Sequence, residues 1–461
     1  MMTFWQGKHV VIVGAARQGL ALAEYLVKKN AVVTLTDKKD ELVIEEEKLL
    51  FEPDQVQWVL GGHPLSLLDD ADLLAVSGGV PLTIPLIQQA QEMGLPVSND
   101  SQIFLGAVPC PVIGITGSAG KTTTTLLIGK IAEAALDADR VWVGGNIGNP
   151  LIQDVERMKA QDTVVMELSS FQLELMTRAP QIACLLNITP NHLDRHETMA
   201  AYTAAKTRIL SFQSRNDTAV INREDPGAWQ QRDKVQGELI TFGIHPPERG
   251  FKGTFVKEGW VCYTNGSEEV DLLPLASIQL RGEHNLLNVL AACAAAQAAG
   301  FPPPAQRAGV EGLKEVEHRL EFVRTWGGAD WYNDSIATAP ERSVAAVKSF
   351  SDPLILLAGG RDKDLPWEDF ASLVVEKVRA LVVFGEAAPL IRRQVEQAAD
   401  RAGESVQITS CAGVREAVLA AAERVKTDDV VLFSPGGTSF DEFEDFAERG
   451  EQYKQWVEEL K

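Results

Sequence analysis

The feature that most constrains the fold is a glycine-rich segment, GITGSAGKTTTT, which spans Gly114 to Thr125. The apolar run PVIGIT leads into it, and a strand that turns into a helix places backbone N–H groups where phosphates bind. Lys121 could neutralise such phosphates, and Thr122 could bind magnesium. The strict phosphate-loop pattern has four residues between its first glycine and the Gly-Lys pair. Here two residues separate Gly117 from the pair Gly120-Lys121, and five separate Gly114 from it. A plain glycine turn would not require Gly-Lys-Thr directly after a strand, so we predict ATP binding.

Alternating apolar runs and helical patterns divide the chain into α/β units. At 461 residues it is too long for one core, and about 150 residues per domain suggests about three domains. Because short apolar runs alternate with helices, we predict mostly parallel sheets. The strand candidates are HVVIVG, AVVTLTD and DLLAVS, then PVIGIT, TVVMEL, IACLLN and TAVIN, then LILLAG, RALVVFG, VQIT and DVVLFS.

Two segments mark the later part of the second unit. Short alternating runs with glycine turns between Gly237 and Pro274 predict antiparallel hairpins at a sheet edge. An alanine-rich helix is predicted from Glu283 to Ala299, and the proline run behind it marks the approach to a boundary. We expect domains at residues 1–108, 109–314 and 315–461.

The charge balance and the cysteines exclude several classes of protein. With 64 acidic and 43 basic side chains, the net charge of -21 disfavours binding to nucleic acids or anionic membranes. The five cysteines form no CxxC pair and no zinc spacing, so neither disulfides nor a structural metal is predicted. No apolar run is long enough to span a membrane. We expect a cytoplasmic protein without membrane insertion.

The segment VGAARQGLA near the N-terminus is similar to a dinucleotide-binding fingerprint, with Gly14 and Gly19 in place and Asp37 at the end of the second strand. Ala16 stands where a glycine would let the backbone approach a pyrophosphate. A tight turn without a ligand and a nicotinamide site therefore remain equal alternatives. A site for a nucleotide diphosphate also stays open.

Polar residues follow several predicted strands. Glu167 follows TVVM, and His192 lies in the cluster NHLDRH after LLNITP. Because the carboxyl ends of strands collect ligands, both could join Thr122 around a magnesium–phosphate centre. Taken singly, each is more often a solvated or capping residue. In the third unit, YNDSIATAP, AGGRDK and SPGGTSFDEF end strands with groups suited to anions, which suggests a second substrate site.

Together these motifs resemble the Mur ligases over nearly the whole chain. The resemblance rests on GITGSAGKTTTT, GNIG, ELSSFQLE, NITPNHLDRH, GEHNLLN, EHRLEFV, NDSIATAP, AGGRDK and SPGGTSFDEF, in that order. It implies an α/β fold of three domains. The first is Rossmann-like, the central one is a P-loop ATPase-like, mostly parallel sheet with antiparallel edge hairpins, and the last is again Rossmann-like.

The resemblance also implies a reaction, in which ATP phosphorylates a substrate carboxylate and an amino group then displaces the phosphate. Catalytic roles fall to Lys121, His192 and Lys206. Two magnesium ions are expected, held by Thr122, Glu167, His192 and Lys206. Lys206 would bind metal after its side chain is carbamylated. An ordinary surface lysine is the alternative for Lys206. The ATP-binding positions are Gly117, Ser118, Ala119, Gly120, Lys121, Thr122, Thr123, Asn285, Asn288, Arg319 and Asp334.

Two further sites follow from the resemblance, which is greatest to the branch that adds D-glutamate to UDP-N-acetylmuramoyl-L-alanine. The UDP substrate would contact Gly14, Asp37, Ser77, Gly78, Gly79 and Asn146, and D-glutamate would contact Thr338, Lys363, Ser439 and Phe446. A lysine and hydroxyls suit a carboxylate. The chain departs from the usual pattern at Ala119, Ile336 and Ala339, and in the SGG of the uracil loop.

Other activities remain alternatives. A related ligase could add L-alanine, a diamino acid, a dipeptide, or glutamate to folate. The DNPR-type motif of the diamino-acid enzymes is missing, and the phosphate loop lacks the histidine usual in the L-alanine enzyme. From other classes, an NAD-dependent dehydrogenase or a regulatory P-loop ATPase could share parts of the pattern. The family also suggests a monomer.

Overall fold

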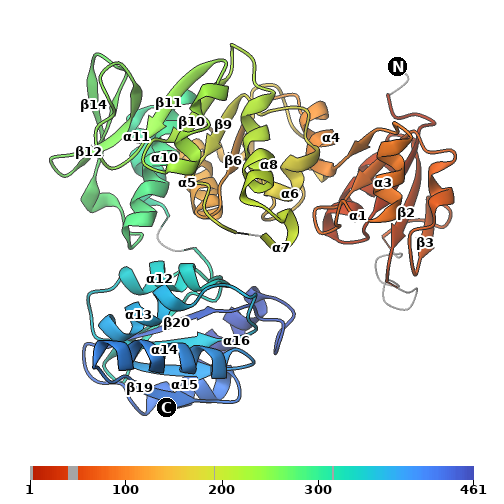
Figure 1. The fold of residues 1–461 in the computed structure, drawn as a ribbon. Coiled ribbons are helices and arrows are strands. Elements are labelled where there is room, and N and C mark those ends of the chain that lie inside the picture. Colours follow the sequence, from red (N-terminus) through yellow and green to blue (C-terminus); the bar gives the residue numbers. More distant parts are fainter. Residues whose placement is uncertain (1–3, 40–49, 192, 314–315) are drawn as a thin grey trace. The chain divides into compact units, whose positions relative to one another are not determined.

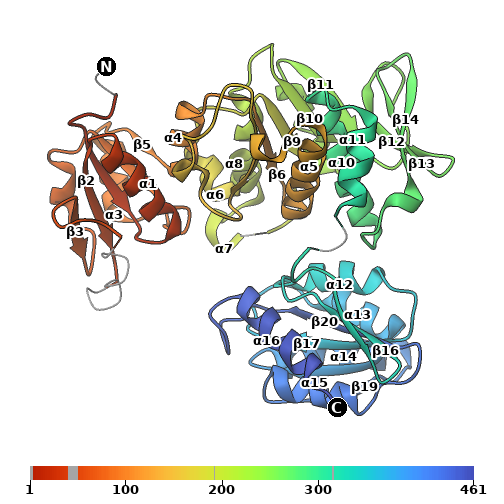
Figure 2. The ribbon, with the colours of Figure 1, turned by 180° about the vertical axis from the view of Figure 1, so that it is seen from behind.

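The computed structural model describes residues 4–39, 50–191, 193–313 and 316–461, which form three β-sheets (Figures 1 and 2). The chain makes two compact units. One extends to Ser277 and includes Leu287–Gly312, and the other combines Ile278–Leu286 with the chain from Leu313 onward. The first two sheets belong to the first unit, and the third sheet belongs to the second unit.

The first sheet has five parallel strands. They are β1 (His9–Val13), β2 (Val32–Asp37), β3 (Val56–Leu60), β4 (Leu73–Val76) and β5 (Val97–Ser98), with helices α1 (Arg17–Lys28), α3 (Pro85–Glu92) and α4 (Asp100–Ala107). The order is β3-β2-β1-β4-β5. Because side chains alternate along a strand, Val10 and Ile12 pack with α1 and α4, whereas Val11 and Val13 pack with α3.

The second sheet has nine strands and carries the phosphate-loop segment. The strands are β6 (Val112–Thr116), β7 (Val141–Gly145), β8 (Thr163–Glu167), β9 (Ile182–Leu185), β10 (Thr218–Asn222), β11 (Glu238–Phe242), β12 (Lys252–Lys257), β13 (Trp260–Thr264) and β14 (Glu269–Pro274). They are ordered β14-β13-β12-β11-β10-β9-β6-β8-β7. The first strand, β6, lies between β8 and β9, so the loops after these three strands meet at one edge.

Helices cover both faces of this second sheet. They are α5 (Lys121–Ala135), α6 (Ser170–Leu175), α7 (Leu193–His196), α8 (Met199–Ser211), α9 (Pro226–Trp229), α10 (Glu283–Ala298) and α11 (Pro303–Glu311). The two opposite views place α6 and α8 on one face and α5 and α10 on the other (Figures 1 and 2). The helix α5 packs extensively against α11.

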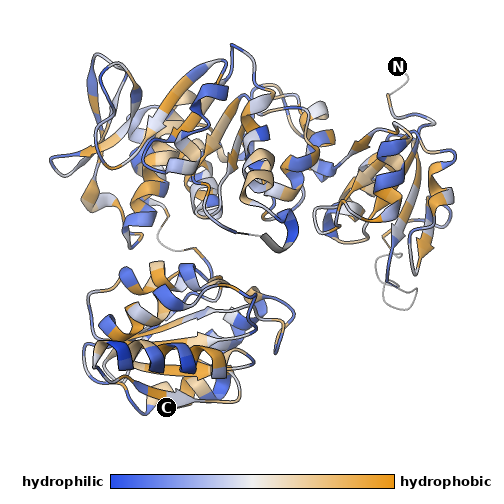
Figure 3. Ribbon diagram, in the orientation of Figure 1, coloured by the Kyte–Doolittle hydropathy of each residue, from blue (hydrophilic) through white to orange (hydrophobic). Residues whose placement is uncertain are grey.

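The third sheet has six strands. They are β15 (Glu321–Trp326), β16 (Ala329–Asn333), β17 (Leu354–Gly359), β18 (Val378–Phe384), β19 (Gln407–Ser410) and β20 (Val430–Gly436), ordered β15-β16-β20-β17-β18-β19. One face packs against α12 (Pro340–Lys348), α13 (Glu368–Lys377) and α14 (Ala388–Ala402). The other packs against α15 (Val414–Ala422) and α16 (Phe446–Glu458). Figure 3 shows hydrophobic strands inside these layers, with hydrophilic residues mostly on outward-facing helices and loops.

The predicted three-domain α/β fold with mostly parallel sheets is confirmed. Between Gly237 and Pro274, the predicted antiparallel pairing holds for β12, β13 and β14. It is wrong for β11, which pairs in parallel with β10 and β12 because the connections on both sides cross over the sheet. The strands β3, β5 and β7 and the antiparallel hairpin β15–β16 were not among the predicted strands. No helix in the described ranges is long and apolar enough to cross a membrane.

Candidate functional site

The glycine-rich loop joins β6 to α5, as the sequence predicts. Gly120 is the N-cap of α5 with φ of 81°, a left-handed conformation that favours glycine. A Cβ atom at this position would lie 2.2 Å from Asn288 Oδ1. The first N–H groups of a helix have no partner within the helix, so this turn offers donors and a positive dipole end to an anion. The loop therefore has the geometry of a phosphate-binding turn.

A second loop, which follows β9, fixes the conformation of the first. The Asn187 carbonyl accepts from Ser118 N at 3.0 Å, and its side chain exchanges two hydrogen bonds with the backbone of Ala119, at 2.8 and 3.1 Å. The Ser118 hydroxyl donates to Thr189 O at 3.0 Å. These bonds hold the loop in shape before any ligand arrives.

Thr122, Glu167 and Asn146 meet beside the start of α5. The Thr122 hydroxyl donates to one carboxylate oxygen of Glu167 at 2.8 Å, and the Asn146 amide donates to the other at 2.8 Å. Glu167 is only 1% exposed. Carboxylate and hydroxyl oxygens are the donors that magnesium prefers, so these residues fit the ion. The described residues contain no group of three or more His, Cys, Asp or Glu side chains arranged to hold a metal.

Lys206 lies in the same site, on α8. Its Nζ donates to Gly117 O at 2.8 Å and lies 4.7 Å from the centre of the Tyr202 ring. Burial, and secondly the positive charge of Lys121, lower the pKa of Lys206 well below its ordinary value, although Glu167 acts in the opposite direction. The side chain is 1% exposed, so the alternative of an ordinary surface lysine is wrong. Lys121 Nζ also donates to Gly117 O, at 2.9 Å.

His192 lies outside the described residues, but the helix α7 that follows it is described. The guanidinium of Arg195 donates to Gly79 O at 3.1 Å and to Val80 O at 3.2 Å, and it stacks over the ring of Phe171. Gly79 belongs to the predicted UDP-substrate positions. Arg195 therefore ties the segment after β9 to the loop after β4.

The other predicted UDP-substrate positions surround the turn between β1 and α1. Asp37 accepts the backbone N–H of Ala15 at 2.7 Å. The hydroxyl of the buried Ser77 donates to Gly14 O at 3.1 Å. Gly78 is half-buried and Gly79 is exposed. The carboxyl ends of β1, β2 and β4 thus bring five of the six predicted residues to one edge of the sheet. The sixth, Asn146, lies beside Glu167 after β7.

In the second unit, Asp334 follows β16 and is almost fully buried. It accepts from the Ser434 hydroxyl at 2.7 Å and from Leu320 N at 3.3 Å. Burial raises the pKa of Asp334 to about 7, although Ser434 and the charge of Arg319 lower it. Arg319 and Asp334, both predicted ATP contacts, therefore lie close enough to interact. Asn285 is buried on α10, with its side chain donating to Arg281 O at 2.7 Å.

The predicted D-glutamate residues occupy the ends of three strands of the third sheet and the start of one helix. Thr338 is half-buried after β16, Lys363 is exposed after β17, Ser439 is buried after β20, and Phe446 begins α16. The strands β16, β20 and β17 are neighbours and run parallel, so the segments that follow them leave the sheet at its carboxyl edge, where α/β proteins bind ligands. The third sheet therefore has a polar site at its carboxyl edge.

Comparison with known proteins assigns the chain to a family. Residues 8–99 match the Mur ligase MurD-like N-terminal domain, residues 115–296 the Mur ligase middle domain, and residues 318–437 the Mur ligase glutamate ligase domain. The chain belongs to the Mur ligase family. It is therefore an ATP-dependent ligase with ligase-family domains along nearly its whole length.

Individual relatives of this Mur ligase agree. It is 41% identical to the UDP-N-acetylmuramoylalanine--D-glutamate ligase of Symbiobacterium thermophilum over 98% of each chain. It is 40% identical to the protein of that name from Pelotomaculum thermopropionicum over 100% of each chain. Among solved structures, it matches the MurF ligase of Thermotoga maritima in complex with ADP, with a TM-score of 0.56 and 19% identity, over 98% of this chain and 94% of that one. That likeness shows the fold.

Sequence reasoning missed a buried cation in this Mur ligase. Arg449, on α16, is 1% exposed, and its guanidinium donates to the Ser335 hydroxyl and carbonyl and to Gly437 O, at 2.8 to 3.1 Å. Burial lowers the pKa of Arg449 to about 10. Arg449 joins the loops after β16 and β20, which carry predicted D-glutamate residues. Its only signal in the sequence was its place three residues after Phe446, one helical turn along.

Proposed function

We propose that this protein uses ATP to add D-glutamate to UDP-N-acetylmuramoyl-L-alanine, in the synthesis of peptidoglycan precursors. The observation that carries the proposal is the 41% identity, over 98% of both chains, to a protein named for that reaction. The phosphate-loop geometry and the buried Lys206 support it independently, because amide synthesis from a carboxylate requires activation by ATP.

We propose that three domains divide the substrates. Residues 1–108 bind the UDP part through Gly14, Asp37, Ser77, Gly78 and Gly79, with Asn146 from the next domain. Residues 109–314 bind ATP through the loop from Gly117 to Thr123 together with Asn285 and Asn288, while Arg319 and Asp334 contribute from the last domain. Residues 315–461 bind D-glutamate through Thr338, Lys363, Ser439 and Phe446.

In the proposed reaction, an oxygen of the substrate carboxylate attacks the γ-phosphorus of ATP, and ADP leaves. The amine of D-glutamate then attacks the acyl carbon, loses a proton, and expels phosphate to leave an amide. Lys121 and the N–H groups at the start of α5 neutralise the phosphates. They keep their positions while negative charge develops on the oxygens of the transferred phosphoryl group and of ADP. Lys363 neutralises a carboxylate of D-glutamate and so orients its amine.

Thr122, Glu167, His192 and Lys206 would hold magnesium, with two ions proposed. Bound there, the metal would supply positive charge that cancels the repulsion between phosphate and carboxylate oxygens. Oxygen donors, with Thr122 and Glu167 already in contact, support this choice.

We further propose that Lys206 is carbamylated. A neutral amine attacks carbon dioxide, forms an N–C bond and releases one proton, and the lowered pKa of Lys206 favours the neutral amine. The carbamate would place a negative charge close to Lys121, which attracts it, and would supply oxygen donors. We also propose that the enzyme works as a monomer in the cytoplasm.

Phosphate release is the test. Purified protein is mixed with ATP, magnesium, UDP-N-acetylmuramoyl-L-alanine and each of a panel of amino acids, including L-alanine, L-glutamate and a diamino acid. We expect release only with D-glutamate, and product of the expected mass. Release that does not depend on D-glutamate, or depends on another amino acid, would overturn the proposal.

A further inference from the structure

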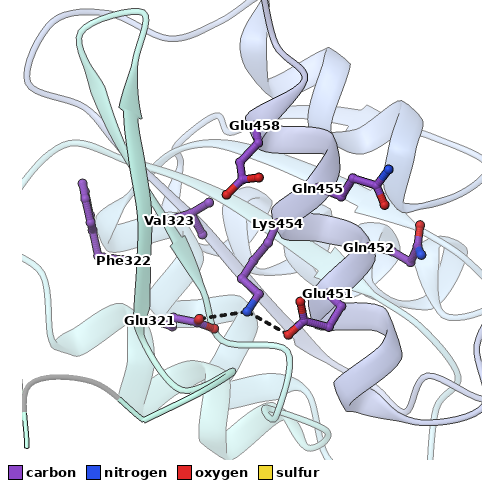
Figure 4. A pocket seen from close by; sticks show the side chains of 8 residues that line it. All are labelled: Glu321, Phe322, Val323, Glu451, Gln452, Lys454, Gln455 and Glu458. Carbon is purple, nitrogen blue, oxygen red and sulfur yellow. Dashed lines mark hydrogen bonds and ion pairs between the residues drawn. The ribbon is translucent and has the colours of Figure 1, made fainter.

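Glu321, at the start of β15, joins three parts of the third-sheet unit. One carboxylate oxygen accepts His318 N at 2.9 Å and the Asn333 side-chain amide at 3.0 Å. The other accepts Lys454 Nζ, from α16, at 3.0 Å (Figure 4). The Glu321 side chain is only 12% exposed, so these charge-assisted bonds are strong.

The two partners on the inner side of Glu321 each precede a predicted nucleotide contact. His318 is followed by Arg319, and Asn333 is followed by Asp334. Asn333 also accepts Ser335 N at 3.1 Å, so Asp334 is held from both sides. Leu320 N donates to the Asp334 carboxylate at 3.3 Å, which closes the network.

The turn that carries Arg319 has an unfavourable backbone. His318 has φ of 59° and Leu320 has φ of 45°, values that non-glycine residues rarely adopt. Such backbone conformations are strained and persist only where surrounding contacts impose them. The bond from His318 N to Glu321 is one of the contacts that impose this turn.

Lys454 supports Glu321 from the solvent side. Its ammonium group bridges Glu321 and Glu451, at 3.0 and 2.8 Å, at a surface pocket of about 350 Å³. Figure 4 shows the three side chains converging, with β15 on one side of the pocket and α16 on the other. Lys454 is 20% exposed, so its charge is partly shielded from water.

We propose that Glu321, held by Lys454, is a positioning residue that fixes Arg319 and Asp334 for nucleotide binding. The inference rests on the proposed function for the assignment of these two residues to ATP. Glu321 touches neither the nucleotide nor the reacting atoms in this proposal. It acts through its hydrogen bonds to His318 and Asn333, the residues that precede Arg319 and Asp334.

The experiment is titration of the full-length protein with ADP by calorimetry, alongside the KM for each substrate. In Glu321→Gln the amide keeps the shape but must present an N–H group to one of its donors. We expect the ADP Kd and the KM for ATP to rise about tenfold, with the KM for D-glutamate nearly unchanged. Lys454→Met should raise both by about threefold, and Lys454→Arg should restore them.

Arg392→Met is the matched control, because Arg392 pairs with Glu396 on α14 of the same unit but contacts none of these residues. It should leave ADP binding unchanged. A folded Glu321→Gln protein with wild-type ADP affinity would overturn the proposal. If that variant does not fold, Lys454→Met decides: wild-type ADP affinity would overturn the inference. Because ADP binding needs no acceptor amino acid, failure of the proposed reaction would appear separately, as release independent of D-glutamate in the wild type.

Discussion

The two glycine turns of the first unit, one between β1 and α1 and the other between β6 and α5, are built alike and charged differently. Both follow a buried parallel strand and contain a glycine with positive φ, Gly14 at 103° and Gly120 at 81°. In both, a neighbouring strand ends in an acid, Asp37 or Glu167. The backbone architecture alone would not tell which turn binds phosphate.

The difference lies in where the acid points. Asp37 accepts the N–H of Ala15 and so brings a negative charge to the first turn itself. At the second turn, a neutral amide, Asn187, takes the N–H of Ala119, while Glu167 bonds Thr122. We expect an acid on the turn to suit hydroxyl donors of a ligand, and an acid displaced to the helix to leave the turn without a negative charge that would repel phosphate.

The largest effect is expected for Lys121→Ala, which removes the cation from the second turn. We expect kcat/KM to fall by about a thousandfold, because fixed charge at a transferring phosphoryl group is worth several kcal/mol. The initial rate of phosphate release as a function of ATP concentration measures kcat/KM. A loss of kcat/KM below tenfold would mean that phosphate binding at the second turn does not depend on the charge of Lys121. The proposed difference in charge between the two turns would then have no functional effect.

Lys206→Ala should reduce the rate by about a hundredfold, and excess acetate should partly restore it by replacing the carbamate. In the wild type, activity at limiting carbon dioxide should fall as the pH falls, because protonation of the amine prevents carbamylation. Restoration is measured as phosphate release against acetate concentration, with chloride as the control salt. Full activity of the unassisted variant would contradict a metal role.

Asp37→Asn tests the first turn. The amide keeps an oxygen that can accept the Ala15 N–H but loses the charge, so we expect the KM for the UDP substrate to rise about tenfold while the KM for ATP stays constant. Steady-state kinetics with each substrate varied in turn measures this. An equal rise in both KM values would show that the two turns do not have separate ligands.

The smallest effect concerns the start of α4, which packs with the first sheet and with α6. Asp100 is buried, and its Oδ1 has no hydrogen-bond partner among the described residues. Burial raises the pKa of Asp100 to about 6. The buried carboxyl stabilises the folded protein only while it is neutral. This stabilisation is complete below about pH 4, where the unfolded chain begins to ionise, and it is lost as the pH rises through 6. Asp100→Asn should stabilise the protein by about 3 kcal/mol at pH 8.

Urea unfolding of the wild type and of Asp100→Asn, at pH 4 and at pH 8, measures that difference. The difference should be much smaller at pH 4, because the carboxyl is then neutral in the folded chain and only about half ionised in the unfolded chain. A difference that does not change with pH would contradict the assignment to Asp100. The activity of the variant should be unchanged, since α4 carries none of the proposed substrate contacts.

Much of this fold could be predicted because strand and helix patterns are local. The runs that became β1, β6 and β17 are apolar and bounded by glycine or charge, which a sequence displays directly. The β15–β16 hairpin was also visible in principle, since Gly327 and Gly328 separate two strand-like segments and Trp326 pairs with Ala329. Its missed assignment reflects unrecognised turn chemistry.

The site was predictable where a motif marks the carboxyl end of a strand, because the ends of neighbouring parallel strands meet at one edge of the sheet. Thr122 and Glu167 follow neighbouring strands, and the structure brings them into contact. Asn187 and Arg449 escaped prediction because their partners, Ala119 and Ser335, are 68 and 114 residues away. Long-range pairing depends on how the sheets close, which composition and periodicity do not encode.

The contact between Gly120 and Asn288 has a consequence for the order of synthesis. The phosphate loop is made early, but the side chain that lies against it, and that also accepts the hydroxyl of Thr124 at 3.3 Å, is translated 168 residues after Gly120. Domains generally fold as they leave the ribosome, and distant contacts form last. A nascent chain that ends before α10 therefore carries the whole glycine-rich motif without its finished binding site.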